Sequence, residues 1–301
     1  MSANTVQLSA SASDGLTAHV TIDLTAGGRV RSIRLVDDAE SVDLLAKPSD
    51  DAASSGWGSF PMAPWAGRIR NGRFRFLGRT VNLDLNHSDD SGIGGGPIDP
   101  PRSAPSGPIH PDDRHRHAIH GTTFHRPWQV VTRTPQRVEM ICSIDGTLGW
   151  PYAGVARQVV ELSPERLELQ LSVEAADHAV FPAAVGWHPW FVKPAALDFH
   201  PVAMYARDDL GLPTGELVTP RPAPWDDCFV NHEPVELHYT RGLGSCIRVS
   251  SPDCEYWVLY DKPEHATCVE PQSGPPDALN LRPEVVTPDR PLRRTMTIAW
   301  S

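Results

Sequence analysis

Four short stretches of the sequence set titratable side chains among aromatic and turn residues. They are PMAPWAGRIRNGRF (61–74), HAIHGTTFHRPW (117–128), AVGWHPWF (184–191) and CVEPQSGPPDALN (268–280), and a fifth stretch, PWDDCF (224–229), carries adjacent carboxylates. Trp faces stack on the apolar C–H faces of a pyranose, while Arg, Asp and His side chains bond to its hydroxyls. Together these residue types predict a sugar-binding pocket.

Glu270 and His188 are the residues best suited to proton transfer in such a pocket. Glu270 follows two apolar residues, and a carboxylate in that position is costly to bury unless it is paired. His188 lies between two tryptophans, where a hydrogen-bonded core histidine is the alternative reading. A carboxylate and an imidazole in one pocket form an acid–base pair, because both groups can titrate near neutral pH.

Segments with period-two alternation recur along the whole chain and predict β-strands. They are rich in β-branched residues and are joined by Gly, Pro, Asn and Asp turns. These segments span residues 16–24, 29–36, 74–85, 137–145, 157–163, 166–175, 245–250, 256–261 and 293–300. Thirty prolines in 301 residues disfavour long helices, and there is no alternation of strands with helices typical of nucleotide-binding α/β folds. We predict an all-β protein.

The stretch from about residue 86 to residue 117 breaks this pattern. It is polar, rich in Pro, Gly and His, and without periodicity, which predicts a surface loop. Strand-like segments of the same kind lie on both sides of it. We therefore expect residues 1–301 to form one large β domain that carries a loop insertion at about 86–117.

Charge and cysteine usage exclude several kinds of partner. The net charge of −10 repels nucleic acid and anionic membrane surfaces. No segment approaches about 18 consecutive apolar residues, and the first residues lack the pattern of a secretion signal. We expect a cytoplasmic protein that binds neither nucleic acid nor membrane. Five dispersed cysteines without CxxC spacing predict reduced, buried thiols.

Four of these motifs occur in an order typical of one protein family. GRIRNGRF (67–74), the pair His120–Gly121, HPWF (188–191) and EPQSGPPDALN (270–280) resemble the signature stretches of the aldose 1-epimerase (mutarotase) family, with comparable spacing. The resemblance covers essentially the whole chain. It implies a galactose mutarotase-like antiparallel β-sandwich, or supersandwich, and an isomerase that interconverts the α and β anomers of an aldohexose without a cofactor or a metal.

The resemblance also implies roles for individual residues. Glu270 matches the base that removes the proton from the anomeric hydroxyl, and His188 matches the acid that protonates the ring oxygen. Arg68 and His120 match residues that contact the sugar near the reacting end. We expect Glu270 to be ionised and His188 to be protonated before the reaction begins.

Asp226 matches an aspartate that holds substrate hydroxyls in a D-x-x-F pattern, here DDCF, and Asp227 is the alternative. The chain departs from the family pattern at two further positions. Gly67 stands where the family commonly has Asn, and Trp190 stands in HPWF where HPYF is commoner, which removes a phenol. Both departures bear on the identity of the substrate.

Alternative functions depend on other residues. A hexose-6-phosphate mutarotase needs extra cations near the pocket, for which Arg70 and Arg73 are candidates. A non-catalytic carbohydrate-binding β-sandwich needs only the stacking and hydroxyl contacts. A glycoside hydrolase needs a second acidic residue beside Glu270, which Asp226 could supply.

A metal site is the remaining alternative. His115, His117 and His120 form an H-x-H-x-x-H run, with Glu270 as a fourth ligand in a cupin-like β protein. His115 and His117 lie among charged residues, which favours a solvated loop. We therefore expect no metal.

Overall fold

The computed structural model describes residues 4–48, 56–88, 98–102, 116–240 and 242–301. Its regular elements are antiparallel β-strands, apart from the 3₁₀ turn η1 (Arg70–Gly72) and the short helix α1 (Ala278–Leu281). The predicted all-β, antiparallel fold is confirmed. None of the helices in the described ranges is long and apolar enough to span a membrane.

The largest sheet has eleven strands and carries most of the candidate site. Its order is β1 (Thr5–Ser11), β2 (Thr17–Asp23), β3 (Arg29–Val36), β5 (Ser59–Met62), β17 (Gly186–Val192), β25 (Ala266–Gln272), β24 (Tyr256–Tyr260), β21 (Asp226–Val230), β19 (Ala203–Arg207) and β20 (Pro213–Val218), with β4 (Ser41–Asp43) on β3. The neighbours β17 and β25 come from the HPWF and EPQ stretches, which lie about 80 residues apart in the chain.

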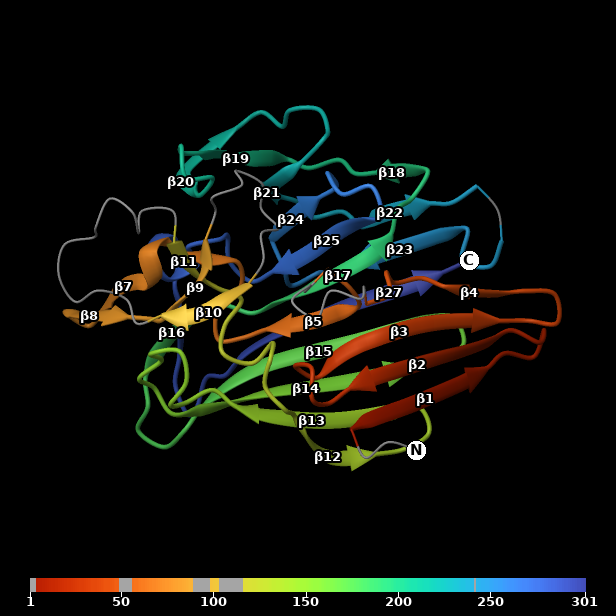
Figure 1. Ribbon diagram of the computed structural model, residues 1–301, viewed down its shortest axis with the longest axis horizontal. Coiled ribbons are helices and arrows are strands. Elements are labelled where there is room, and N and C mark those ends of the chain that lie inside the picture. Colours follow the sequence, from red (N-terminus) through yellow and green to blue (C-terminus); the bar gives the residue numbers. More distant parts are fainter. Residues whose placement is uncertain (1–3, 49–55, 89–97, 103–115, 241) are drawn as a thin grey trace.

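The second large sheet has eight strands and lies against the first (Figure 1). Its order is β12 (Gln129–Arg133), β13 (Arg137–Ser143), β14 (Gly154–Leu162), β15 (Arg166–Ala175), β27 (Leu292–Trp300), β23 (Cys246–Ser250), β22 (Val235–His238) and β18 (Ala196–Asp198). All nine segments with period-two alternation form strands of the structure. The segment 74–85 is not one strand, because a turn at Leu77 and Gly78, both with positive φ, divides it into a hairpin.

Shorter strands gather at one end of the sandwich, on the left in Figure 1. They form a four-stranded sheet in the order β10 (Ile98–Arg102), β9 (Leu85–Ser88), β11 (Arg116–Ile119) and β6 (Arg68–Ile69), the hairpin β7 (Arg73–Phe76) and β8 (Arg79–Asn82), and the pair β16 (Phe181–Ala183) and β26 (Glu284–Val286). The segment 86–117, expected to be a loop, thus carries strand at both ends and at residues 98–102. Its remaining residues lie outside those described.

The main hydrophobic core lies between the two large sheets. Gln158 of β14 is fully buried there and joins them: its Nε2 donates to the carbonyl of Gly28, and its Oε1 accepts from Trp187 Nε1, each at 3.0 Å. Side chains alternate between the two faces of a strand. Since Trp187 lies on the core face of β17, His188 lies on the opposite face. That opposite face forms the candidate site.

The five cysteines are all free. Four are buried and Cys246 is half-buried, so the expectation of buried thiols holds for four of them.

Candidate active site

Strand register brings the acid and base residues together. Gly186 pairs with Gln272 and Trp190 pairs with Cys268, so His188 and Glu270 face each other midway between these pairs. Side chains directly opposite in an antiparallel pair project from the same face. The sequence motifs alone do not contain this alignment, because it depends on hydrogen bonds between distant strands.

The same row of residues continues across the neighbouring strands. Phe60 of β5 lies opposite His188, and Val258 of β24 lies opposite Glu270. In the next row, Tyr260 pairs with Cys268 on one side and with Asp226 on the other. Asp226 therefore reaches the same face as Glu270 although the two residues lie on strands separated by β24.

His188 and Glu270 are in direct contact at the floor of this face. His188 Nε2 lies 3.2 Å from Glu270 Oε1, and both side chains are nearly inaccessible to solvent. Gln272 Nε2 donates to Glu270 Oε2 at 3.2 Å. The imidazole stacks on Phe60 and on Trp190, at centroid distances of 4.9 and 5.1 Å. Packing thus holds both groups in a fixed geometry.

Burial governs the protonation of this pair. Burial, reinforced by the nearby Asp226 carboxylate, raises the pKa of Glu270 well above its usual value, against the opposing effects of Gln272 and Arg68. Burial and the cation of Arg29 lower the pKa of His188 to about 3. Both directions favour neutral side chains, so the proton of the sugar-free pair resides on Glu270. The sequence predicts an ionised Glu270 and a protonated His188. The structure favours the neutral pair instead, because the expected state would place two charges in a buried site.

Arg68 and His120 enter the pocket from the small sheet. Arg68 on β6 pairs with Ile119 on β11, and His120 follows at the end of β11 with a φ of 61°. The backbone N–H of His120 donates to the carbonyl of Gly67 at 2.9 Å, which keeps the two segments adjacent. The His120 ring lies edge-on to His188 at 5.1 Å. Burial, followed by the neighbouring His188, lowers the pKa of His120 well below its usual value, so it stands as a neutral imidazole.

Asp226 and Asp227 occupy different environments. Asp226 lines the pocket, together with Arg68, His120, His188 and Glu270. The carboxylate of Asp227 is instead buried between two arginines: its Oδ1 lies 3.0 Å from Arg207 Nε and its Oδ2 lies 2.6 Å from Arg221 Nη2. Of the two candidates, Asp226 is therefore the one with access to a ligand. All five predicted site residues line one pocket.

Other lining residues have no assigned role from the sequence. Gln272 and Tyr260 line the same pocket, and Tyr260 contacts Trp190 edge-on at a centroid distance of 5.9 Å. Tyr260 thus brings a phenol to a pocket whose HPWF motif lacks one. Gln272 belongs to the EPQ motif, so the sequence could have indicated that it lines the site. Tyr260 lies in an ordinary strand pattern, and nothing in the sequence indicated its place in the pocket.

The burial of Arg29 beside the site was also not predictable from the sequence, because Arg29 is the first residue of a strand with ordinary alternation. It is 1% exposed, and its guanidinium lies over the rings of Trp57 and Phe60, at 4.0 and 4.6 Å from their centroids. Its Nη1 donates to the Trp57 carbonyl at 2.8 Å. Burial lowers the pKa of Arg29 to about 9, which still leaves a cation at pH 7. Phe60 therefore separates this buried charge from the His188 ring.

Gly67, where the family commonly has Asn, also lines the pocket. Its φ is +65°, and a Cβ added there would lie 3.1 to 3.2 Å from atoms of Pro276. The glycine therefore lets the proline of the EPQ stretch pack directly on the loop before Arg68.

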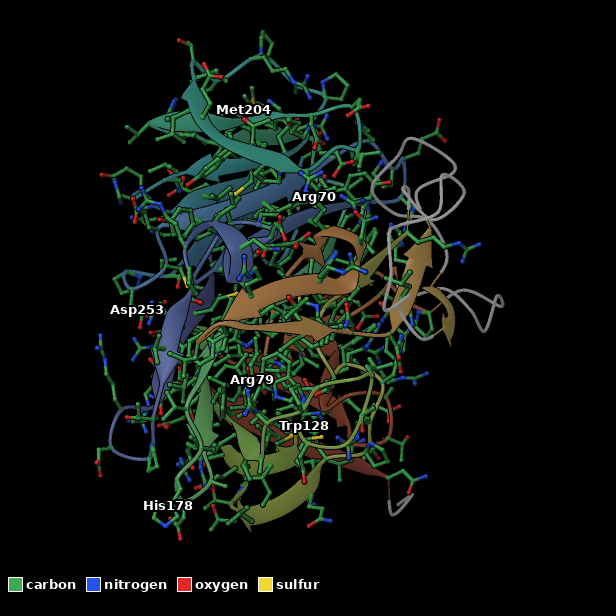
Figure 2. The ribbon with its side chains drawn as sticks, turned by 90° about the vertical axis from the view of Figure 1, so that its left-hand side faces the viewer. Arg70, Arg79, Trp128, His178, Met204 and Asp253 are labelled. Atoms are coloured by element: carbon green, nitrogen blue, oxygen red, sulfur yellow. The ribbon has the colours of Figure 1, made fainter. Side chains whose placement is uncertain are left out.

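Arg70, the candidate phosphate ligand, is engaged by carboxylates. Its Nη1 lies 2.7 Å from Asp208 Oδ2, and its Nε lies 3.7 Å from Asp277 Oδ2. Figure 2 shows Arg70 where the β6–β7 segment meets strands β19 and β20. Arg73 Nε donates to Asn82 at 3.0 Å, within the β7–β8 hairpin. Neither arginine is among the residues that line the pocket.

The histidine run does not form the suggested metal site within the described residues. His117 is fully buried in β11, where its Nδ1 accepts a hydrogen bond from the backbone of Asn71 at 3.2 Å. The expectation that it lies in a solvated loop was wrong, because strand pairing with β9 carries it into the interior. His120 lines the pocket, and His115 lies outside the described residues.

A larger groove lies over β1, β2 and β3. Its lining includes His19, Arg34 and Arg133 but no carboxylate among the described residues. Of these two pockets, the smaller one on β17 and β25 is the one that contains a carboxylate beside an imidazole, and we take it as the candidate active site.

The fold and the pocket define a β-sandwich protein with a buried carboxylate–imidazole pair. Residues 8–240 match the model of the aldose 1-epimerase family, so the chain belongs to that family. It is 24% identical over 244 residues to the uncharacterized protein YihR of Escherichia coli K12, an alignment that covers 73% of this chain and 70% of YihR.

Solved structures share the fold over the full length. A galactose mutarotase-like protein from Clostridium acetobutylicum superposes with a TM-score of 0.73 at 16% identity, covering 99% of each chain. The GalM/aldose epimerase homologue of C. elegans gives a TM-score of 0.72 at 15% identity, again over 99% of each chain. The expected galactose mutarotase-like fold is thereby confirmed.

Proposed function

We propose that this protein is an aldose 1-epimerase that interconverts the α and β anomers of a free aldohexose, acting as one domain over residues 1–301. The observation that carries the proposal is the 3.2 Å contact between His188 Nε2 and Glu270 Oε1 at the floor of a pocket. Family membership supports an epimerase acting on a sugar. The contact supports acid–base chemistry within that class.

Anomer exchange needs only proton transfers at the acetal carbon. Opening the ring removes a proton from O1 and adds one to O5, the C1–C2 bond then rotates, and closing reverses both transfers. Glu270 acts as the base at O1, and His188 acts as the acid at O5. Each role contributes about 10²–10⁴-fold to the rate.

The resting pair holds the single proton that this reaction requires. Its transfer from Glu270 to His188 across their 3.2 Å contact produces the ionised base and the protonated acid. Sugar hydroxyls and the Arg68 cation stabilise the carboxylate once the pocket is occupied, because they supply the polarity that burial removes. His120, as a neutral imidazole, hydrogen-bonds to the sugar near the reacting end.

A free sugar is favoured over a sugar phosphate. Phosphate recognition draws on cationic donors that are available to the ligand, and both arginines considered for that role, Arg70 and Arg73, have partners outside the pocket. The aromatic ring that lines the pocket is that of Tyr260, which offers the apolar face of a hexose a contact surface instead.

A mutarotation panel tests the proposal. Polarimetry on freshly dissolved α anomers of glucose, galactose, other aldoses and their 6-phosphates should show enzyme-dependent acceleration with at least one free hexose. Acceleration confined to phosphorylated sugars would reverse the choice of substrate. Sugar binding by calorimetry without any acceleration would instead identify a carbohydrate-binding module.

Asp226→Asn should raise KM by about tenfold with a smaller change in kcat, because a charge-assisted hydrogen bond to a sugar hydroxyl is worth about 1.5–3 kcal/mol. Asp227→Asn is the matched control. Its main effect should be a lower Tm, since it weakens the contacts to Arg207 and Arg221. A raised KM in the control with an unchanged KM in Asp226→Asn would reverse the assignment.

Arg29→Met should move the acid limb of the kcat/KM profile to higher pH. Removing the cation raises the pKa of His188, so the pair takes up a second proton at higher pH and Glu270 can no longer act as the base. We expect a displacement of about half a pH unit or more. Methionine keeps the apolar contacts to Trp57 and Phe60.

The control for this prediction is Arg31→Met. Arg31 also lies over the Trp57 ring, at 5.6 Å, but its side chain is 45% exposed. The mutarotation rates of Arg31→Met, measured by polarimetry across the acid range, should coincide with those of the wild type. Equal displacement in both variants would mean that Arg29 does not act on His188.

A further inference from the structure

The acid–base pair has a third potential metal ligand beside it. The ligand atoms of His188, Cys268 and Glu270 all lie within 4.8 Å of one another, and all three side chains are buried. Strand register explains the cluster: Cys268 and Glu270 are two residues apart on β25 and share a face, while His188 projects from the same face of β17. The mechanism proposed above uses two of these groups and leaves the thiol without a role.

The three groups match the ligands that zinc prefers. Zinc takes imidazole nitrogen and carboxylate oxygen at about 2.0–2.2 Å and thiolate sulfur at about 2.3 Å, in tetrahedral geometry. Two N or O ligands at those lengths lie about 3.3 Å apart, and His188 Nε2 lies 3.2 Å from Glu270 Oε1. Three protein ligands leave a fourth position for water.

The ligands are also held in place by their neighbours. Gln272 donates to Glu270 Oε2 and leaves Oε1 on the side of His188. Phe60 and Trp190 stack on the imidazole. Supporting contacts of this kind orient the ligands in protein metal sites.

We propose that His188, Cys268 and Glu270 form an inhibitory binding site for Zn²⁺. Binding uses the lone pairs of Nε2 and Oε1 and releases the thiol proton, and the proton shared by the pair, to solvent. Neither acid nor base is then available to the sugar, so the ion is an inhibitor and not a cofactor. The inhibition rests on the proposed function, whereas the binding does not. Hard cations such as Mg²⁺, which have little affinity for thiolate, do not inhibit.

A second cluster in the described residues supplies an internal control. Glu236, His238 and Cys246 bring ligand atoms within the same distance of one another, on the half-buried faces of β22 and β23. There Arg248 Nη1 already lies 2.9 Å from Glu236 Oε1, so a cation is opposed by a neighbouring positive charge. This cluster lies on the eight-stranded sheet, whereas β17 and β25 belong to the eleven-stranded sheet.

Cobalt absorption tests the binding without any activity assay. Co²⁺ added to the reduced protein should produce a thiolate-to-cobalt charge-transfer band in the near ultraviolet, and excess Zn²⁺ should remove it. Cys268→Ser should abolish the band. Cys228→Ser, which changes a buried cysteine separated from Glu270 by strand β24, and Cys246→Ser should both retain it.

Inhibition is measured on the same variants by polarimetry. Cys268→Ser should keep kcat within about twofold of the wild type and raise the inhibition constant for Zn²⁺ about tenfold or more, since even indirect supports of a metal ligand are worth 10–100-fold. A band that survives Cys268→Ser, or is lost in Cys246→Ser, overturns the proposal. A band that depends on Cys268, in a protein that mutarotates no sugar, sustains the metal site and refutes the proposed function.

Discussion

Glu270→Gln should lower kcat for mutarotation by about 10²–10⁴-fold with little change in KM. The amide keeps the shape of the side chain and its place beside Gln272, but it cannot accept the proton of the anomeric hydroxyl. Polarimetry with the preferred hexose measures the effect. Glu284→Gln, at a carboxylate of β26 that is paired with Arg294 of β27, should leave kcat unchanged.

The stability of this variant is expected to depend on pH in a defined direction. Burial raises the pKa of Glu270 above 4.5, so its contribution to folding is fully present below that value and is lost as the pH rises towards the raised pKa. Glutamine does not titrate. The Tm of Glu270→Gln should therefore equal that of the wild type near pH 4 and exceed it at pH 7. A folded variant with near wild-type kcat would refute the role of Glu270 as base.

Gly121→Ala should strongly destabilise the fold beside the site. A Cβ at Gly121 would lie 2.0 Å from the carbonyl oxygen of Ala63, and the glycine has a φ of +81°. The two backbones are held together by the hydrogen bond from Thr122 N–H to Ala63 O at 2.8 Å. We expect a loss of about 3 kcal/mol or more in the free energy of unfolding.

Gly78→Ala separates the two causes of this loss. Gly78 has a similar φ of +77°, but nothing lies within 4 Å of its added Cβ, so only backbone strain of about 1 kcal/mol applies. Denaturant unfolding of both variants measures the difference. Gly121→Ala should also lower kcat/KM, because separating the backbones displaces His120 from Arg68. Equal losses in the two variants would contradict the steric argument.

Much of the candidate site was predictable because its residues lie in short, chemically distinctive motifs. Glu270, His188, His120, Arg68 and Asp226 all line the one pocket. The protonation of the pair was not predictable, since it depends on the depth of burial and on Arg29, which lies far away in the sequence. Arg70 looked available to a phosphate because the sequence does not show that Asp208 and Asp277 lie beside it.

The sequence by itself determined nine segments that form strands, because alternation with period two follows from local backbone geometry, and it identified five of the residues that line the pocket. Only the tertiary structure decided which neighbour faces the ligand. The D-x-x-F spacing favoured Asp226 without excluding Asp227, but pairing of Asp226 with Tyr260 turns the Asp226 carboxylate to the pocket and leaves that of Asp227 between two arginines. The burial of His117 and the approach of Cys268 to the acid–base pair were decided in the same way. Register between distant strands depends on long-range hydrogen bonds and packing, which no local pattern encodes.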